Sequence, residues 1–186
     1  MSKVTIAGDA NGTGVFTIAA PNGNTNRTLT LPDEAGTILT TATAGVPIGG
    51  PAFSAYQSTL QSTSSGTWTK VAFQTEEFDT NLNFDSTANY RFTPTVAGYY
   101  QVNGAVQFAA PLASVEVVSI YKNGTSYKRG MLGKASFYSF SVSALVYLNG
   151  STDYVELYAL QNSGVAVNTN VASDTTYFQA SMVRSA

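Results

Sequence analysis

The sequence predicts an all-β protein, and three observations support this fold class. From Pro51 onward, short runs of β-branched and aromatic residues recur about every eight to twelve residues. Gly, Asn, Asp and Pro separate these runs, as expected for turns between strands. No segment has the apolar spacing of an amphipathic helix. This pattern is typical of a sandwich or a barrel of antiparallel strands.

Two long segments show the alternation of half-buried strands. In residues 100–108 and 138–148, every second residue is apolar or glycine, and the intervening positions are mostly Gln, Asn or Ser. We expect these alternating side chains to line the core: Tyr100, Val102, Gly104, Val106 and Phe108 in the first segment, and Tyr138, Phe140, Val142, Ala144, Val146 and Leu148 in the second.

Two Asn-Gly pairs predict tight turns. Asn123-Gly124 and Asn149-Gly150 each stand between strand-like runs. Asn-Gly suits a type I′ hairpin because both central residues of that turn need positive φ. We therefore expect a β-hairpin at each pair.

The segment 154–160 is apolar on both faces. Val155, Leu157 and Ala159 alternate with a second set that contains Glu156 and three larger residues. A strand with apolar residues on both sides is usually covered on both sides. We predict that the first face lies in the core and that the second contacts another subunit through Tyr154, Tyr158 and Leu160.

The first 50 residues differ from the rest of the chain. They contain one aromatic residue, Phe16, and half of the 16 glycines. Their strand-like runs, residues 4–8, 15–21, 27–32 and 37–41, are too thin to close a core. We predict an extended arm over residues 1–45, a linker over residues 46–50 and one β-domain over residues 51–186.

Charge and composition exclude several classes of partner. Charged residues make up 11% of the chain, well below the usual quarter, which favours a surface covered by other subunits. The net charge is −2 and no run of Lys or Arg is present, so we expect no nucleic-acid partner. No segment resembles a membrane span. The N-terminal residues lack the apolar core of a secretion signal, which predicts release by lysis or within a particle.

The residues of most active sites are missing. The chain has no His and no Cys, and it has neither a nucleophile elbow nor a phosphate loop. Glu76, Glu77, Asp79 and Asp85 could form a catalytic carboxylate pair, but we interpret them as a solvated loop. Residues 8–14 match only part of a calcium loop, so a turn explains them. We expect no enzyme activity, no cofactor and no metal.

One segment carries a resemblance to a known family. Residues 90–102, "YRFTPTVAGYYQV", resemble the globular head of complement component q and its tumour-necrosis-factor-like relatives. Matching pieces occur in the family's order between "PAFSA" and "TYFQASMV", over about 135 residues. The most specific positions are Tyr90, Phe92, Pro94, Gly98, Tyr99 and Tyr100.

This resemblance implies a ten-stranded jelly-roll sandwich that assembles as a homotrimer. It also implies that Pro94 ends one strand and that Gly98 forms the bend before the next. The chain departs from the family at "NGSTD", where Gly-Asp is usual, and at Ala180, where glycine is usual.

A second resemblance concerns the arm. Residues 27–41, "RTLTLPDEAGTILTT", resemble a short segment of bacteriophage virion proteins, above all tail fibres. It implies a virion location and a structural role. We expect the arm to contact capsid or other virion proteins through Phe16, Leu29, Leu31 and Ile38.

Three roles follow from these patterns. The short arm favours a capsid cement or decoration protein over a tail fibre, which needs a shaft. A tail fibre or receptor-binding tip would adsorb to a host glycan, with aromatic residues such as Trp68, Tyr127 and Tyr138 available for stacking. The third role is a non-viral, trimeric, lectin-like surface module.

Overall fold

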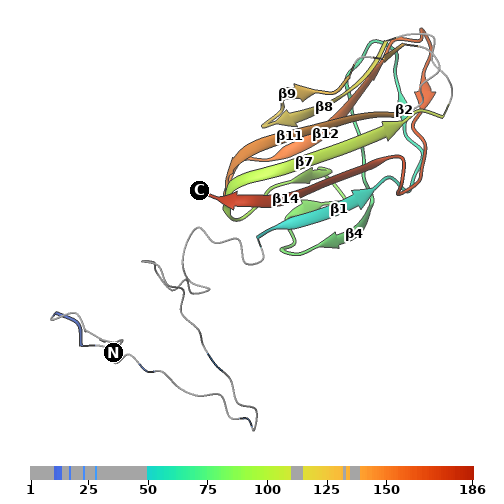
Figure 1. The fold of residues 1–186 in the computed structure, drawn as a ribbon. Helices are drawn as coiled ribbons and strands as arrows, with labels where there is room; N and C mark the ends of the chain where they lie inside the picture. Colours follow the sequence, from blue (N-terminus) through green and yellow to red (C-terminus); the bar gives the residue numbers. More distant parts are fainter. Residues whose placement is uncertain are drawn as a thin grey trace. The chain divides into compact units, whose positions relative to one another are not determined.

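The computed structural model describes residues 50–109, 115–131, 133–134 and 139–186, together with residues 11–13, 17, 23 and 28 (Figure 1). The four predicted arm strands, Tyr138, and the arm residues Phe16, Leu29, Leu31 and Ile38 lie outside the described residues. The chain divides into two units, Met1–Ile38 and Leu39–Ala186. The predicted boundaries at residues 45 and 50 remain predictions.

The described part of the second unit is an all-β sandwich, which confirms the predicted fold class. Its regular elements are all strands. The described residues therefore contain no helix that is long and apolar enough to cross a membrane. The strands, some only two residues long, are β1 (Ala52–Tyr56), β2 (Ser62–Thr63), β3 (Thr69–Lys70), β4 (Thr75–Asp79), β5 (Phe84–Asp85), β6 (Arg91–Phe92), β7 (Ala97–Gln107), β8 (Val115–Lys122), β9 (Thr125–Arg129), β10 (Gly133–Lys134), β11 (Ser139–Asn149), β12 (Val155–Gln161), β13 (Val167–Asn168) and β14 (Tyr177–Ser185).

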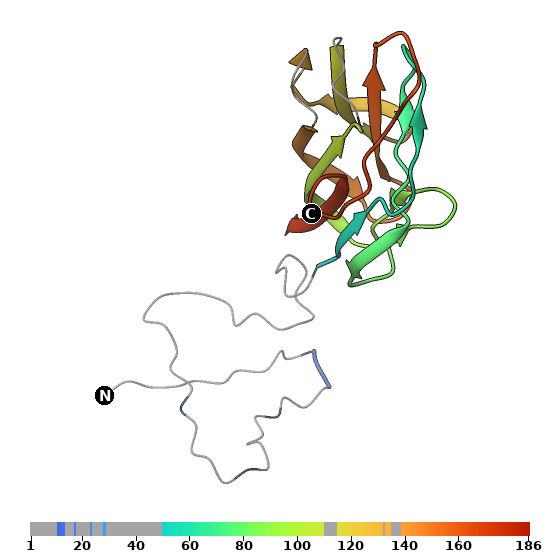
Figure 2. The same cartoon turned by 90° about the vertical axis from the view of Figure 1, so that its right-hand side faces the viewer.

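One layer is a five-stranded antiparallel sheet in the order β11-β7-β14-β1-β4. The same sequence of strands can be followed down the sandwich in Figure 1. The first and last strands of the domain are neighbours, because β1 pairs with β14 from Ala52 opposite Ser181 to Tyr56 opposite Tyr177. The red end of β14 therefore lies beside the teal start of β1 (Figure 2).

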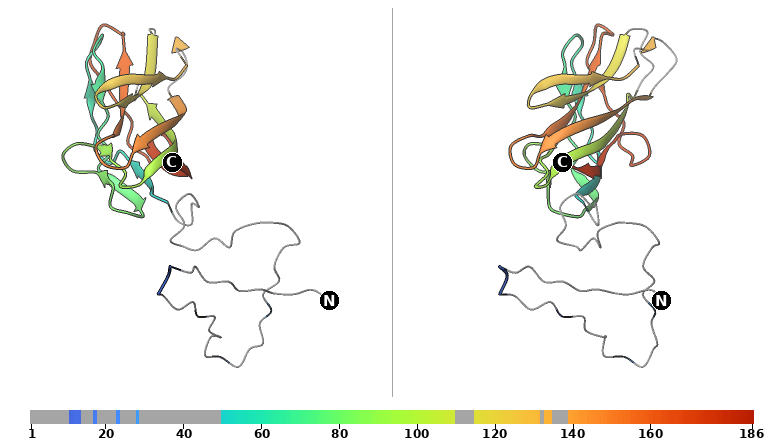
Figure 3. Two further views of the ribbon diagram at one scale, coloured as in Figure 1. Left: turned by 90° about the vertical axis from the view of Figure 1, so that its left-hand side faces the viewer. Right: turned by 60° about the vertical axis from the view of Figure 1, so that its left-hand side comes forward.

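The other layer is a seven-stranded sheet in the order β10-β8-β12-β6-β5, with β3 paired to β12 and β9 paired to β8. The hairpin of β8 and β9, drawn in yellow and gold, lies toward the β10 margin of this layer (Figure 3). A third sheet consists of β2 and β13 alone.

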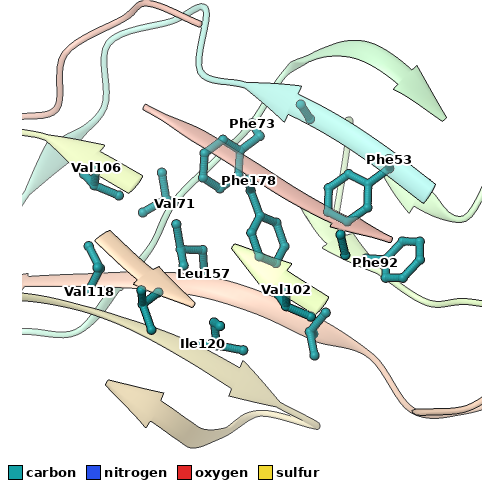
Figure 4. Packing of buried hydrophobic residues seen from close by; sticks show 14 of the residues in the cluster. Phe53, Val71, Phe73, Phe92, Val102, Val106, Val118, Ile120, Leu157 and Phe178 are labelled. Carbon is teal, nitrogen blue, oxygen red and sulfur yellow. The ribbon is translucent and has the colours of Figure 1, made fainter. Parts of the chain in front are cut away.

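The core lies between the two large sheets. The Phe53 ring stacks on Phe84 at a centroid distance of 4.5 Å and on Phe92 at 4.7 Å. Phe178 meets the Phe53 ring edge-on at 5.2 Å. Figure 4 shows Val118, Ile120 and Leu157 of the seven-stranded sheet facing Val102 and Phe178 of the other. The two predicted alternating faces are confirmed where they are described, since the core includes Tyr100, Val102, Val106, Phe108, Phe140, Val142, Val146 and Leu148.

The "FTPTVAG" corner breaks the chain between the two sheets. β6 ends at Phe92, Pro94 is buried, and β7 begins at Ala97, so the predicted role of the proline is confirmed. The predicted bend at Gly98 is wrong, because Gly98 lies inside β7. A Cβ at this position would come within 2.5 Å of the Arg184 carbonyl oxygen, so glycine permits close approach to the bulged end of β14.

The two Asn-Gly pairs behave differently. At Asn123 and Gly124, φ is 52° and 77°, and β8 and β9 form the predicted hairpin. The hairpin predicted at Asn149-Gly150 is wrong, because β11 belongs to the five-stranded sheet and β12 to the seven-stranded sheet. Here the Asn149 Oδ1 atom accepts hydrogen bonds from the backbone N–H groups of Ser151, Thr152 and Asp153, so the pair shapes a crossover between layers.

Candidate self-association surface

Most strands of the five-stranded sheet carry very few charges, the exception being β4 with Glu76, Glu77 and Asp79. The three neighbouring strands β11, β7 and β14 contain a single charged residue, Arg184. Because their inward side chains fill the core, the intervening residues form the outer surface. We call this surface the β11–β7–β14 face: Tyr99, Gln101, Asn103, Ser139, Ser141, Ser143, Leu145, Tyr147, Gln179, Ser181 and Val183.

Polar side chains in the middle of this face bond to one another. Ser143 Oγ donates to Asn103 Oδ1 at 2.8 Å, and Gln101 Nε2 donates to Ser143 Oγ at 2.8 Å. These contacts cross from β11 to β7, whose residues 143 and 103 are direct partners. Such internally bonded, uncharged groups can be covered by another subunit at a lower desolvation cost than ionised groups.

One end of the face is apolar and exposed. Leu145 and Val183 are 52% and 48% exposed, and the Tyr99 and Tyr147 rings lie 5.5 Å apart. An open hollow of about 600 Å³ is lined by Tyr99, Leu145, Val183, Arg184, Ser185 and Ala186. An apolar patch beside uncharged polar groups is a surface suited to protein contact.

Sequence reasoning missed this apolar end. The signal was present, because the polar positions of residues 139–149 change from Ser139, Ser141 and Ser143 to Leu145 and Tyr147. A continuous half-exposed strand would have kept polar residues there. Val183 has a similar signal, since it follows Gln179 and Ser181 at the outward positions of β14 while Phe178 and Ala180 face the core.

The predicted interface residues lie on the other sheet. Tyr158 and Leu160 are half-buried on β12, and Tyr154 is half-buried directly before this strand, while Val155, Leu157 and Ala159 are fully buried, as predicted for the core face. The Tyr158 ring stacks on Tyr121 at 3.9 Å, and the Arg91 guanidinium lies 4.4 Å from the centre of the Tyr154 ring. Their role as a subunit interface remains a prediction.

The acidic cluster is dispersed over local contacts. The predicted loop is wrong for Glu76, Glu77 and Asp79, which lie on β4. Glu76 accepts a hydrogen bond from Ser86, Glu77 accepts one from Ser54, and Asp79 accepts one from the Phe84 N–H. The backbone N–H of Ala88 is the main cause of a lowered pKa at Asp85. The four acidic side chains therefore stabilise turns and strand edges.

No cation cage is formed by the described residues, among which no group of three or more Asp and Glu side chains could hold a metal ion. Most of the 8–14 segment lies outside this part of the chain. Trp68 and Tyr127 are described, and both have a cation over the ring: Arg129 at 5.3 Å and Lys128 at 5.2 Å, respectively.

Comparison with solved structures shows the same arrangement of sheets in other proteins. Murine APRIL matches 72% of this chain and 98% of its own, with a TM-score of 0.54 and 14% identity. The globular domain of zebrafish complement 1qA protein matches 73% of this chain and 99% of its own, with a TM-score of 0.53 and 16% identity. The fold is a complement-head and tumour-necrosis-factor-like jelly roll.

The jelly roll also resembles a viral protein. PRD1 vertex protein P5 matches 72% of this chain and 73% of its own, with a TM-score of 0.55 and 16% identity. No protein-family model matches the sequence, and no curated protein matches it either. Because all these identities are low, the comparisons establish the jelly roll and leave the activity to be argued from the surface.

Proposed function

We propose that this chain is a non-enzymatic, homotrimeric virion structural protein of a bacteriophage, and that it acts as a capsid cement or decoration protein. The jelly-roll fold, shared with a PRD1 vertex protein, supports a structural role. The observation that carries self-association is the β11–β7–β14 face, where three strands with one charged residue expose Tyr99, Leu145, Tyr147 and Val183. In this proposal the arm attaches the trimer to the particle through Phe16, Leu29, Leu31 and Ile38.

The particle itself tests the location. Gold-labelled antibody against residues 51–186, applied to purified particles, should label the capsid shell. Label confined to the tail would instead establish the second candidate, a tail fibre or receptor-binding tip. No label on intact particles would contradict the virion proposal and leave the non-viral surface module.

The arm can be tested separately from the head. We expect a chain without residues 1–45 to remain folded and trimeric, because the described core and the β11–β7–β14 face lie between residues 50 and 186. It should no longer bind particles stripped of the native protein, as measured by co-sedimentation. Retained binding would move the attachment site from the arm to the head.

Self-association has two candidate surfaces, and matched variants separate them. We propose that Leu145→Asp breaks the trimer, because it places a charge on an exposed apolar position of the β11–β7–β14 face. Tyr158→Ser tests the surface predicted from the sequence. Light scattering should give one 19.6 kDa chain for Leu145→Asp and three chains for Tyr158→Ser. The reverse result would assign the interface to Tyr154, Tyr158 and Leu160.

A further inference from the structure

A second surface lies on the outer side of the seven-stranded sheet. The strand register places Arg129 on β9, Ser119 on β8, Tyr158 on β12 and Lys70 on β3 in one row across four strands. Directly paired residues project to the same side of a sheet. The row spans three strand spacings, on the order of 14 Å. We call Trp68, Tyr121, Tyr158, Arg129 and Lys70 the aromatic–arginine face.

The three rings of this face hold one another in place. Tyr121 stacks on Tyr158 with ring centroids 3.9 Å apart, and Trp68 meets Tyr121 edge-on at 5.9 Å. All three residues are half-buried, so each keeps part of its surface open to solvent. Burial raises the pKa of Tyr158 to about 12, so its hydroxyl stays protonated and can donate a hydrogen bond even at a pH that ionises an ordinary tyrosine. Ring side chains held in this way lose little conformational entropy when they bind a ligand.

The charges around the rings leave a net positive surface. Lys70 is neutralised by the buried Glu156, since its Nζ atom lies 2.9 Å from Glu156 Oε1. Arg129 is exposed, and its guanidinium lies 5.3 Å from the centre of the Trp68 ring. Within the described residues Arg129 has no acidic partner. An arginine held over an aromatic ring keeps its planar donors available for a carboxylate.

We propose that the aromatic–arginine face binds an acidic oligosaccharide that carries carboxylate groups. Aromatic surface accepts the apolar C–H side of a sugar ring, and Tyr hydroxyl groups at its edge can bond to sugar hydroxyls. Arg129 supplies the complementary charge for the carboxylate through two parallel N–H donors. This inference goes beyond the proposed function, because it concerns the isolated head and holds for a capsid or a tail location.

Charge complementarity favours this occupant over a second copy of the chain. If the β11–β7–β14 face of another subunit covered Arg129, the guanidinium would lose its water. It would find no carboxylate in exchange, because these three strands contain no acidic residue. The two surfaces therefore have different roles: the β11–β7–β14 face serves self-association, and the aromatic–arginine face binds an anionic ligand.

The sole tryptophan of the chain provides a direct test, because Trp68 belongs to the proposed site. The full-length protein is titrated with a hexamer of galacturonic acid while intrinsic tryptophan fluorescence is recorded. We expect a saturable change, and no change with the neutral galactose hexamer. Arg129→Gln should weaken binding about tenfold, which corresponds to the loss of one charge-assisted contact.

Lys128→Gln is the matched control. Lys128 neighbours Arg129 and carries the same charge, but it pairs with the core residue Ile120 and so lies on the opposite side of the sheet. The affinity of Lys128→Gln for the galacturonic acid hexamer should remain within about twofold of the wild-type value. Equal losses for the two variants would indicate unspecific charge attraction and overturn the site.

Two further outcomes would also contradict the proposal. One is the absence of a saturable change up to millimolar uronate with a folded protein. The other is dissociation of the trimer by Arg129→Gln in light scattering, which would assign the surface to a subunit contact. Because neither the fluorescence titration nor the light scattering uses phage particles, this inference can fail while the proposed function stands.

Discussion

Glu116 is the residue whose environment is least expected from its chemistry. It lies on β8, is fully buried, and among the described residues neither of its carboxylate oxygens has a hydrogen-bond partner. Its cross-strand neighbours are Gln161 on β12 and Gly133 on β10, where an added Cβ would collide with the Phe140 ring. Burial without a partner raises the pKa of Glu116 from 4.5 to about 7.

This pKa makes stability depend on pH in a defined window. Between pH 4.5 and about 7 the folded chain holds a proton at Glu116 that the unfolded chain has released. Stability is therefore greatest below this window and falls as the pH rises through it. Glu116→Gln should match the wild type in acid and exceed its free energy of unfolding by on the order of 3 kcal/mol near pH 8.

Urea denaturation of both proteins across this pH range measures the effect. Asp174→Asn is the control, because it removes an exposed carboxylate and keeps the buried one. It should leave the dependence of stability on pH unchanged. Parallel profiles for the wild type and Glu116→Gln would show that Glu116 is paired or solvated in the folded protein.

At the scale of the elements, the connections decide which sheet each strand joins. Gly124, in the β8–β9 hairpin, has a φ of 77°, and Gly150, at the β11–β12 crossover, has a φ of 71°. Replacing either glycine by a residue with a Cβ should therefore cause nearly the same backbone strain. Their surroundings differ, because among the described residues a Cβ at Gly124 meets only the Tyr154 hydroxyl oxygen, at 3.6 Å, whereas a Cβ at Gly150 would collide with the backbone at Ala97.

Alanine at these glycines should separate strain from collision. We expect Gly124→Ala to cost about 1 kcal/mol of stability, from the positive φ alone. Gly150→Ala should cost at least about 2 kcal/mol, because the start of β7 must also shift. Gly164→Ala, with a φ of 88° and no atom of the described residues within 4 Å of the added Cβ, is the control for pure strain. Thermal melts that rank Gly150→Ala with Gly164→Ala would contradict the predicted collision.

At the scale of the whole molecule, charge is unevenly distributed over the strands, since β11, β7 and β14 have few charges while β4 of the same sheet carries Glu76, Glu77 and Asp79. Arg184 is the only charged residue of strands β11, β7 and β14, whereas strands of the other sheet contain the cations Lys70, Arg91, Lys122, Lys128 and Arg129. Contacts between surfaces with few charges depend little on ionic strength, while exposed charges are screened within about 8 Å at physiological salt.

Salt should therefore separate the two proposed activities. Between about 0.05 and 1 M NaCl, the mass from light scattering should stay that of a trimer, and the affinity for the galacturonic acid hexamer should fall at least about tenfold. Dissociation of the trimer at high salt would instead indicate that ion pairs hold the subunits together. An unchanged uronate affinity would argue against the role of Arg129.

Local pattern was sufficient for much of this fold. Alternation in residues 100–108 and 139–148 identified the core faces, because successive strand residues point to opposite sides whatever the partner strand is. Asn123-Gly124 identified its hairpin, because the required φ values belong to the two residues themselves. The Pro94 corner and its flanking aromatic residues carried the resemblance to the jelly roll.

Tertiary structure alone decided which strands became neighbours and which outer faces remained open. The Asn149-Gly150 pair looks like a second hairpin, yet the layer that β12 enters depends on pairing with β8, a strand more than 30 residues earlier. The aromatic–arginine face brings together Lys70, Tyr158 and Arg129 from distant parts of the chain. Alternation in the sequence predicts on which side of its strand a residue lies. The residues beside it on the neighbouring strands depend on long-range pairing.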